Sequence, residues 1–144
     1  LLSDIAQSPL FGAADLRVAP ASPGKAERLK PFLSHGRATL YVNLEEAGLL
    51  CQTAFDDAAT AARALKVRGA RRVLVTNGGD QAAEITGDGV LTATPPQVMV
   101  TRVTGAGDTF MAAHIVAELR GAPRKDALET ALQTAANYVS GKSE

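Results

Sequence analysis

The stretch that decides the fold is Val103-Thr104-Gly105-Ala106-Gly107-Asp108-Thr109-Phe110, which leads directly into the apolar segment Met111 to Leu119. Small residues and one carboxylate therefore stand where an apolar helix is expected to begin. The unpaired N–H groups of a first helical turn lie at the positive end of the helix dipole and suit an anion. Small side chains let a phosphate approach the backbone, and Asp108 is placed to accept a proton from a neighbouring hydroxyl. The stretch thus contains the parts that phosphoryl transfer needs.

A purely structural interpretation fits the same residues. A glycine-rich turn before a helix is an ordinary tight connection, and an aspartate in the first turn is an ordinary cap. The stretch also differs from the common phosphate-binding fingerprints: G-x-x-x-x-G-K-[ST] is absent, and Phe110 stands where G-x-G-x-x-G needs its last glycine. The turn alone does not decide between the two interpretations.

Composition limits the classes of protein that the chain can belong to. Its 144 residues are 46% hydrophobic and 21% charged, which predicts one soluble domain with a substantial core. A formal net charge of zero provides no electrostatic footprint for nucleic acid or an anionic membrane. No apolar run approaches the roughly 20 residues of a membrane span. The single cysteine, Cys51, excludes an internal disulfide and a Cys-based zinc cluster, so we expect a reducing, cytoplasmic compartment.

The first residues suggest that the chain is part of something larger. The segment from Leu1 to Ala6 begins without Met and resembles the middle of an amphipathic helix. We therefore expect residues 1–144 to be the C-terminal part of a longer polypeptide.

Hydrophobic periodicity and turn residues predict an alternation of strands and helices. Helices are expected over residues 22–34, 46–50, 55–67, 107–120 and 125–139. Strands are expected over residues 15–19, 39–42, 72–76 and 97–100, with a hairpin formed by 83–86 and 90–94. This order is typical of a parallel three-layer α/β/α sheet with right-handed crossovers, here with a β-hairpin near its end.

Three polar segments fall where the carboxyl ends of parallel strands meet, which is where such sheets bind ligands. They are residues 43–46, 76–80 and 104–108. Asn43 and Glu46 lie on one side of a helical turn and could hold a hydrated Mg²⁺, or they could simply cap a helix. Thr76 and Gly78 offer a hydroxyl and an open backbone, as an ordinary strand-end turn also would. The convergence of the three segments favours a site.

This combination resembles the ribokinase-like, or PfkB, carbohydrate kinase family over about residues 15–141. The resemblance rests on four segments: Asn43-x-x-Glu46, Val73 to Gly78, Val103 to Asp108, and Ala135-Ala136-Asn137. It implies a ribokinase-like fold, a small sugar or nucleoside substrate, ATP and Mg²⁺. By this resemblance Asp108 is the general base, and the N–H groups of Gly105, Ala106 and Gly107 form the anion hole for the transferring phosphoryl group.

The resemblance also implies a set of cofactor-binding residues. Glu46 and Asn43 organise Mg²⁺ and its waters against the ATP phosphates. Thr76 and Gly78 lie along the nucleotide, and Asn137 flanks the adenine.

The substrate is less well defined by the sequence. The segment Pro20-Ala21-Ser22 with Lys25 to Leu29 resembles the one that precedes the N-x-x-E strand in pseudouridine kinases, although a well-capped helix explains it equally well. Pseudouridine, converted to pseudouridine 5'-phosphate, is our first choice. The alternatives are another PfkB sugar kinase and a non-catalytic nucleotide-binding module or inactive kinase fragment.

Four departures from the family pattern matter. Arg102 stands where the family usually has Asp or Asn, in a region that in many members holds a monovalent cation, so we expect activity that is independent of K⁺. Asn77 replaces a usual Leu and Gln81 a common Gly, which affects the nucleotide contacts. The family's N-terminal half and β lid are absent, so we expect the 144 residues alone to turn over little. A homodimer of the intact protein is left open.

Both histidines are expected to be structural. His114 and His35 are interpreted as lacking a metal-ligating partner three or four residues further on. Cys51 is expected to pack in the core, and Asp56 and Asp57 to favour a helix dipole.

Overall fold

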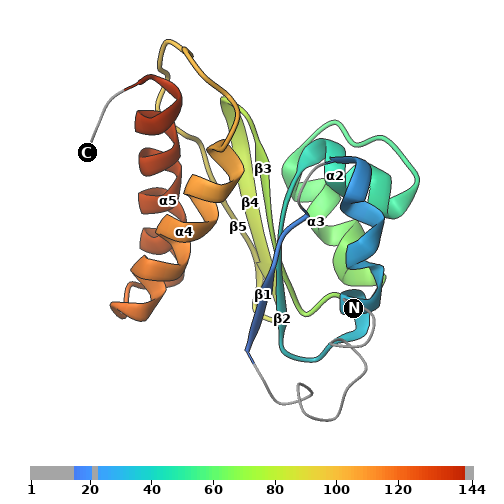
Figure 1. Ribbon diagram of the computed structural model, residues 1–144. Helices are drawn as coiled ribbons and strands as arrows, with labels where there is room; N and C mark the ends of the chain where they lie inside the picture. Colours follow the sequence, from blue (N-terminus) through green and yellow to red (C-terminus); the bar gives the residue numbers. More distant parts are fainter. Residues whose placement is uncertain (1–14, 21–22, 142–144) are drawn as a thin grey trace.

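The computed structural model describes residues 15–20 and 23–141 (Figure 1). These residues form one five-stranded sheet with helices on both faces. The helix-like segment from Leu1 to Ala6 and Ser22, the first residue of the helix expected over 22–34, lie outside the described residues.

The sheet has the strand order β1-β2-β3-β4-β5. Its strands are β1 (Leu16–Val18), β2 (Ala38–Asn43), β3 (Arg72–Asn77), β4 (Asp80–Thr86) and β5 (Gly89–Ala93). The first three are parallel, and β3, β4 and β5 pair in antiparallel fashion. The prediction of an α/β sheet ending in a hairpin is confirmed.

Two helical layers enclose this sheet. Figure 1 shows η1 (Pro23–Ser34), α2 (Leu44–Cys51) and α3 (Ala58–Val67) on one face, and α4 (Ala106–Leu119) and α5 (Arg124–Val139) on the other. The first helix is a 3₁₀ helix that contains Pro31, which lacks the N–H needed for an α-helical hydrogen bond. No helix in the described part of the chain is long and apolar enough to span a membrane.

Each face of the sheet carries its own hydrophobic core. Side chains of successive strand residues point to opposite faces, so Leu40 and Val42 join the core under η1, α2 and α3, whereas Tyr41 joins the core under α4 and α5. Cys51 belongs to the first core and is 3% exposed. Burial on both faces explains the nearly continuous apolar sequence of β2.

The prediction of a strand over residues 97–100 is wrong. This segment pairs with none of the described strands and forms part of the loop from β5 to α4. Pro95 and Pro96 cannot donate to a strand ladder. The loop instead crosses to the end of α5, where the N–H groups of Thr101 and Arg102 donate to the Val139 carbonyl at 2.6 and 3.1 Å.

Candidate active site

A pocket of about 590 Å³ opens at the carboxyl ends of β2 and β3. Asn43 pairs with Thr76 in the register of these strands, so the two residues lie side by side. The predicted site residues that line this pocket are Asn43, Glu46, Thr76, Gly78, Gly105, Ala106, Gly107 and Asp108. The structure therefore brings the three polar segments of the sequence together.

Asn43 and Glu46 form a reciprocal cap at the start of α2. The Glu46 N–H donates to Asn43 Oδ1, and the Asn43 N–H donates to Glu46 Oε1, both at 2.8 Å. Glu46 is only 9% exposed, and burial raises the pKa of its carboxyl group. Its second oxygen, Oε2, has no hydrogen bond recorded to any described residue. Asn43 and Glu46 therefore do cap the helix, as the structural interpretation expected. The cap uses only Oε1 of Glu46, so Oε2 is held in place and can still bind a ligand.

The loop before α4 presents backbone donors to the same pocket. Gly105 caps the helix with φ +91°, a conformation that favours glycine. The Ala106 N–H donates to Val103 O at 3.0 Å, whereas no acceptor is recorded within the described part of the chain for the N–H groups of Gly105, Gly107 and Asp108. Two of the three expected donors are thus free, the Ala106 N–H is engaged, and the Asp108 N–H is a free donor that the sequence analysis missed.

Asp108 supplies the carboxylate of the site. It lies in the first turn of α4, is exposed, and lines the pocket that Glu46 also lines. A carboxylate beside free N–H groups can accept a proton from a hydroxyl while those groups bind an anion.

A smaller cavity of about 200 Å³ adjoins the first and shares Thr76, Gly78 and Gly107 with it. Its other walls are mostly apolar: Pro95, Pro96, Val98, Val100, Leu132, Ala135, Ala136 and Val139. The apolar run expected as a strand over 97–100 therefore forms part of a cavity wall.

Asn137, which was expected to flank the adenine, and the two departures Asn77 and Gln81 lie at different places. Asn137 lines neither cavity, and its Oδ1 accepts a hydrogen bond from Gln133 Nε2 at 3.0 Å. Asn77 lines the larger pocket, and Gln81 is exposed on β4.

A buried polar network ties α4 to the sheet beneath the site. Tyr41 Oη and His114 Nδ1 are 2.9 Å apart, and Arg17 donates to Tyr41 Oη at 2.8 Å. Glu118 pairs with Arg17 at 2.8 Å and with Arg72 at 2.9 Å. Burial lowers the pKa of His114 to about 4. Burial opposes ionisation of Glu118, but the bonds from Arg72 and Arg17 lower its pKa to about 2.

The interpretation that His114 lacks a ligating partner four residues on is wrong, because Glu118 lies 3.8 Å from its Nδ1. With Glu84 these residues bring three ligand atoms within 4.8 Å of one another. The Arg72 guanidinium, however, donates to Glu84 Oε2 at 2.7 Å and to Glu118 Oε2 at 2.5 Å. Arg17 also pairs with Glu118, and Arg124 lies 3.6 Å from Glu84. Because arginines already balance the charge of both carboxylates, the cluster is an ion-pair network that joins β3, β4 and α4.

Comparison with known proteins defines the family. The model of the pfkB family carbohydrate kinases matches residues 3–143. The chain belongs to this family. A 1-phosphofructokinase from Haloferax volcanii is 39% identical over 83 residues, which are 58% of this chain and 27% of that protein.

Solved structures share the fold of this chain. Phosphofructokinase-2 from Escherichia coli has a TM-score of 0.77 at 21% identity, over 96% of this chain and 47% of that one. Adenosine kinase from Trypanosoma brucei brucei has a TM-score of 0.74 at 23% identity, over 86% of this chain and 42% of that one. These likenesses show a shared ribokinase-like fold. The chain spans less than half the length of each of these three proteins.

Proposed function

We propose that the protein containing this chain transfers the γ-phosphoryl group of ATP to a primary hydroxyl of a sugar or nucleoside, and that this chain provides the phosphoryl-transfer side of the site. One observation carries the proposal. Asp108, the free N–H groups of Gly105 and Gly107, and the fixed carboxylate of Glu46 all line one pocket.

Each of these groups has a role in the reaction. Asp108 takes the proton from the acceptor hydroxyl. The hydroxyl oxygen bonds to the γ-phosphorus, and the bond between the γ-phosphorus and the ADP oxygen breaks. Charge develops on the phosphoryl oxygens, and the N–H groups of Gly105 and Gly107 donate to them. These donors are fixed before the reaction, so they need little reorganisation during it.

The donor set fits a hydrated magnesium ion. Mg²⁺ keeps several waters and needs few carboxylates, and Glu46 offers the unbonded Oε2 with Asn43 beside it. When bound, the ion would neutralise charge on the nucleotide phosphates. Thr76 and Gly78 line both cavities, which suits a nucleotide with its phosphates in the polar pocket and its base in the apolar one. Asn137 belongs to the same helix as the wall residues Ala135 and Ala136, and its contact with adenine stays a prediction.

We further propose that Arg102 makes the activity independent of K⁺. Its Nε donates to the Tyr138 carbonyl at 2.7 Å, so a fixed positive charge already lies at the end of α5. Replacement of Na⁺ by K⁺ in the assay of the intact protein should leave kcat unchanged within about twofold. A several-fold rise in turnover with K⁺ would contradict this.

The central test replaces Asp108 by Asn in the intact protein. Loss of the base should lower kcat by about 10²- to 10⁴-fold, while the Kd for ATP changes little. Asp126→Asn is the matched control, because Asp126 also lies in the first helical turn of its helix, α5, but lines neither cavity. A non-catalytic nucleotide-binding module would instead bind ATP without turnover in any form.

Pseudouridine remains our first choice of substrate. Pro20 lines the pocket, whereas Ala26 and Leu29 of the adjoining segment are buried in the core, which suits a structural helix as well. This choice is tested by measuring kcat/KM of the intact protein for pseudouridine, uridine, ribose and fructose phosphates. If another acceptor has a higher kcat/KM than pseudouridine, that acceptor is the better candidate for the substrate and pseudouridine is rejected.

A further inference from the structure

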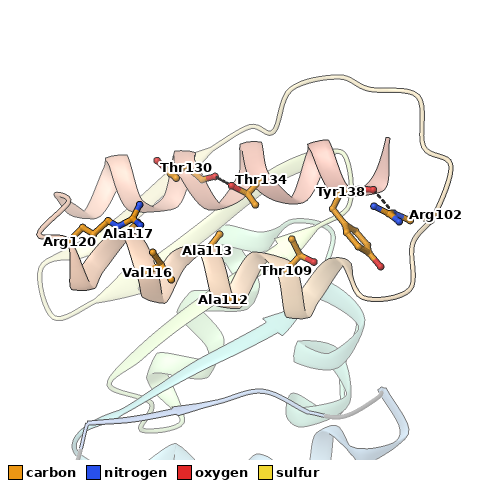
Figure 2. Close-up of a pocket in the computed structure, with 10 residues that line it drawn as sticks. All are labelled: Arg102, Thr109, Ala112, Ala113, Val116, Ala117, Arg120, Thr130, Thr134 and Tyr138. Carbon is orange, nitrogen blue, oxygen red and sulfur yellow. Dashed lines mark hydrogen bonds between the residues drawn. The ribbon is translucent and has the colours of Figure 1, made fainter. Parts of the chain in front are cut away.

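Tyr138, near the end of α5, contacts the loop that precedes α4. Its hydroxyl donates to the Thr104 carbonyl at 2.5 Å. Figure 2 shows the ring extending from α5 toward the first turn of α4, close to Thr109, with Arg102 beside it. The Arg102 guanidinium carbon lies 4.0 Å from the ring centroid. Tyr138 therefore closes one end of a groove of about 680 Å³ between the two helices.

The position of Tyr138 relative to this loop is fixed by the backbone. Arg102 Nε donates to Tyr138 O at 2.7 Å, and the Thr101 N–H donates to Val139 O at 2.6 Å. The Val139 carbonyl is one that the last turn of α5 leaves without a partner inside the helix, and the Tyr138 carbonyl also accepts from the Gly141 N–H at 3.1 Å. The end of α5 and residues 101–104 thus form one hydrogen-bonded unit.

Peptide geometry links this unit to the anion site. In a planar trans peptide the C=O and the N–H point in opposite directions. Because Tyr138 holds the Thr104 C=O toward α5, the N–H of the same peptide, which belongs to Gly105, points away from α5. That N–H has no acceptor recorded among residues 15–20 and 23–141, and both Thr104 and Gly105 line the larger pocket.

We propose that Tyr138 is a positioning residue that aims the Gly105 N–H at the phosphoryl group, with Arg102 holding the tyrosine in place. The proposal rests on the function proposed above. Close packing supports it: a Cβ added to Gly105 would lie 2.6 Å from Tyr138 Oη, so the tyrosine hydroxyl reaches the backbone itself. A side chain at position 105 would therefore displace the Tyr138 hydroxyl from this place.

The test uses Tyr138→Phe in the intact protein, since this change keeps the ring under Arg102 and removes only the hydroxyl. Loss of a whole oxyanion donor lowers kcat by about 10²- to 10³-fold, so a misaimed donor should lower it by about tenfold. The KM for the acceptor should stay unchanged. Thr134→Val is the matched control, because Thr134 Oγ1 also donates to a backbone carbonyl of α5, at 3.0 Å, and its kcat should be that of wild type. Equal kcat values for Tyr138→Phe and wild type would overturn the proposal.

A binding measurement separates this proposal from the proposed function. Inorganic phosphate is titrated into the ¹⁵N-labelled intact protein while the Gly105 amide resonance is followed. The resonance should shift saturably in wild type and Thr134→Val, with at least about fivefold weaker affinity in Tyr138→Phe. If no acceptor is phosphorylated but this pattern holds, the kinase function fails and the role of Tyr138 stands. If Gly105 responds equally in all three proteins, the role of Tyr138 is refuted whatever the activity.

Discussion

Acid should destabilise this protein through His114. The ring is fully buried, its Nδ1 faces the Tyr41 hydroxyl, and its Nε2 has no partner recorded among the described residues. Arg17 donates to that hydroxyl, so the phenol proton is available to Nδ1 and the imidazole is neutral. The charged groups nearby are Glu118, which favours protonation, and Arg72 and Arg17, which oppose it. Burial dominates and lowers the pKa to about 4.

The sign and size of the effect follow from this shift. Between about pH 6.5 and pH 4 the unfolded chain binds a proton at His114 that the folded chain does not, so stability falls as pH falls. A change from pH 7 to pH 5 should therefore lower the free energy of unfolding by about 2 kcal/mol through this group alone. Protonation of Glu118, whose folded-state pKa is about 2, adds a further loss only below about pH 4.5.

Urea unfolding of the intact protein at pH 7 and pH 5 measures this effect in wild type and in His114→Gln. The variant should lose about 2 kcal/mol less than wild type over that interval, whatever its stability at pH 7. His35→Gln is the matched control, because it replaces the other histidine and keeps His114. Ring resonances of His114 provide a direct check. The reasoning is refuted if His114→Gln keeps the wild-type pH dependence, or if His114 titrates near pH 6.5 in the folded protein.

Three further predictions concern the 144 residues alone, the anion loop and the ion-pair network. The 144 residues alone should show less than about 1% of the intact protein's turnover in a coupled ADP assay, because the chain spans less than half the length of its relatives and catalysis of this kind needs a site closed to water; normal turnover would contradict this. Gly105→Ala should lower the free energy of unfolding by about 1–2 kcal/mol or more because of its φ of +91°, whereas Gly107→Ala, where a Cβ meets nothing within 4 Å, should change it little. Glu118→Gln should cost about 2 kcal/mol, because it removes the negative charge that the partly buried Arg17 and Arg72 share, whereas Glu129→Gln on the exposed surface of α5 should cost less than about 0.5 kcal/mol; equal losses would refute the role of the network.

Local patterns in the sequence predicted most of the elements correctly. The apolar runs over 39–42 and 72–76 are buried strands, and the Gly87-Asp88-Gly89 turn connects a hairpin. The strand predicted at 97–100 is absent because a short apolar run does not by itself specify a strand: Val98 and Val100 line a cavity, and Met99 is 83% exposed. Likewise, the motif around Gly105 predicted backbone donors, but only the fold determined that the Ala106 N–H is engaged with Val103.

By itself the sequence determined the order of strands and helices apart from residues 97–100, the rim where the polar segments meet, and the residue types suited to phosphoryl transfer. Periodicity, turn chemistry and the ends of parallel strands are short-range properties, so they can be read along the chain. Tertiary structure alone decided the pairing of Tyr41 with His114, 73 residues apart, and of Tyr138 with Thr104, 34 residues apart. Such contacts depend on how two layers pack against one sheet, and no local pattern specifies which hydroxyl will meet which partner.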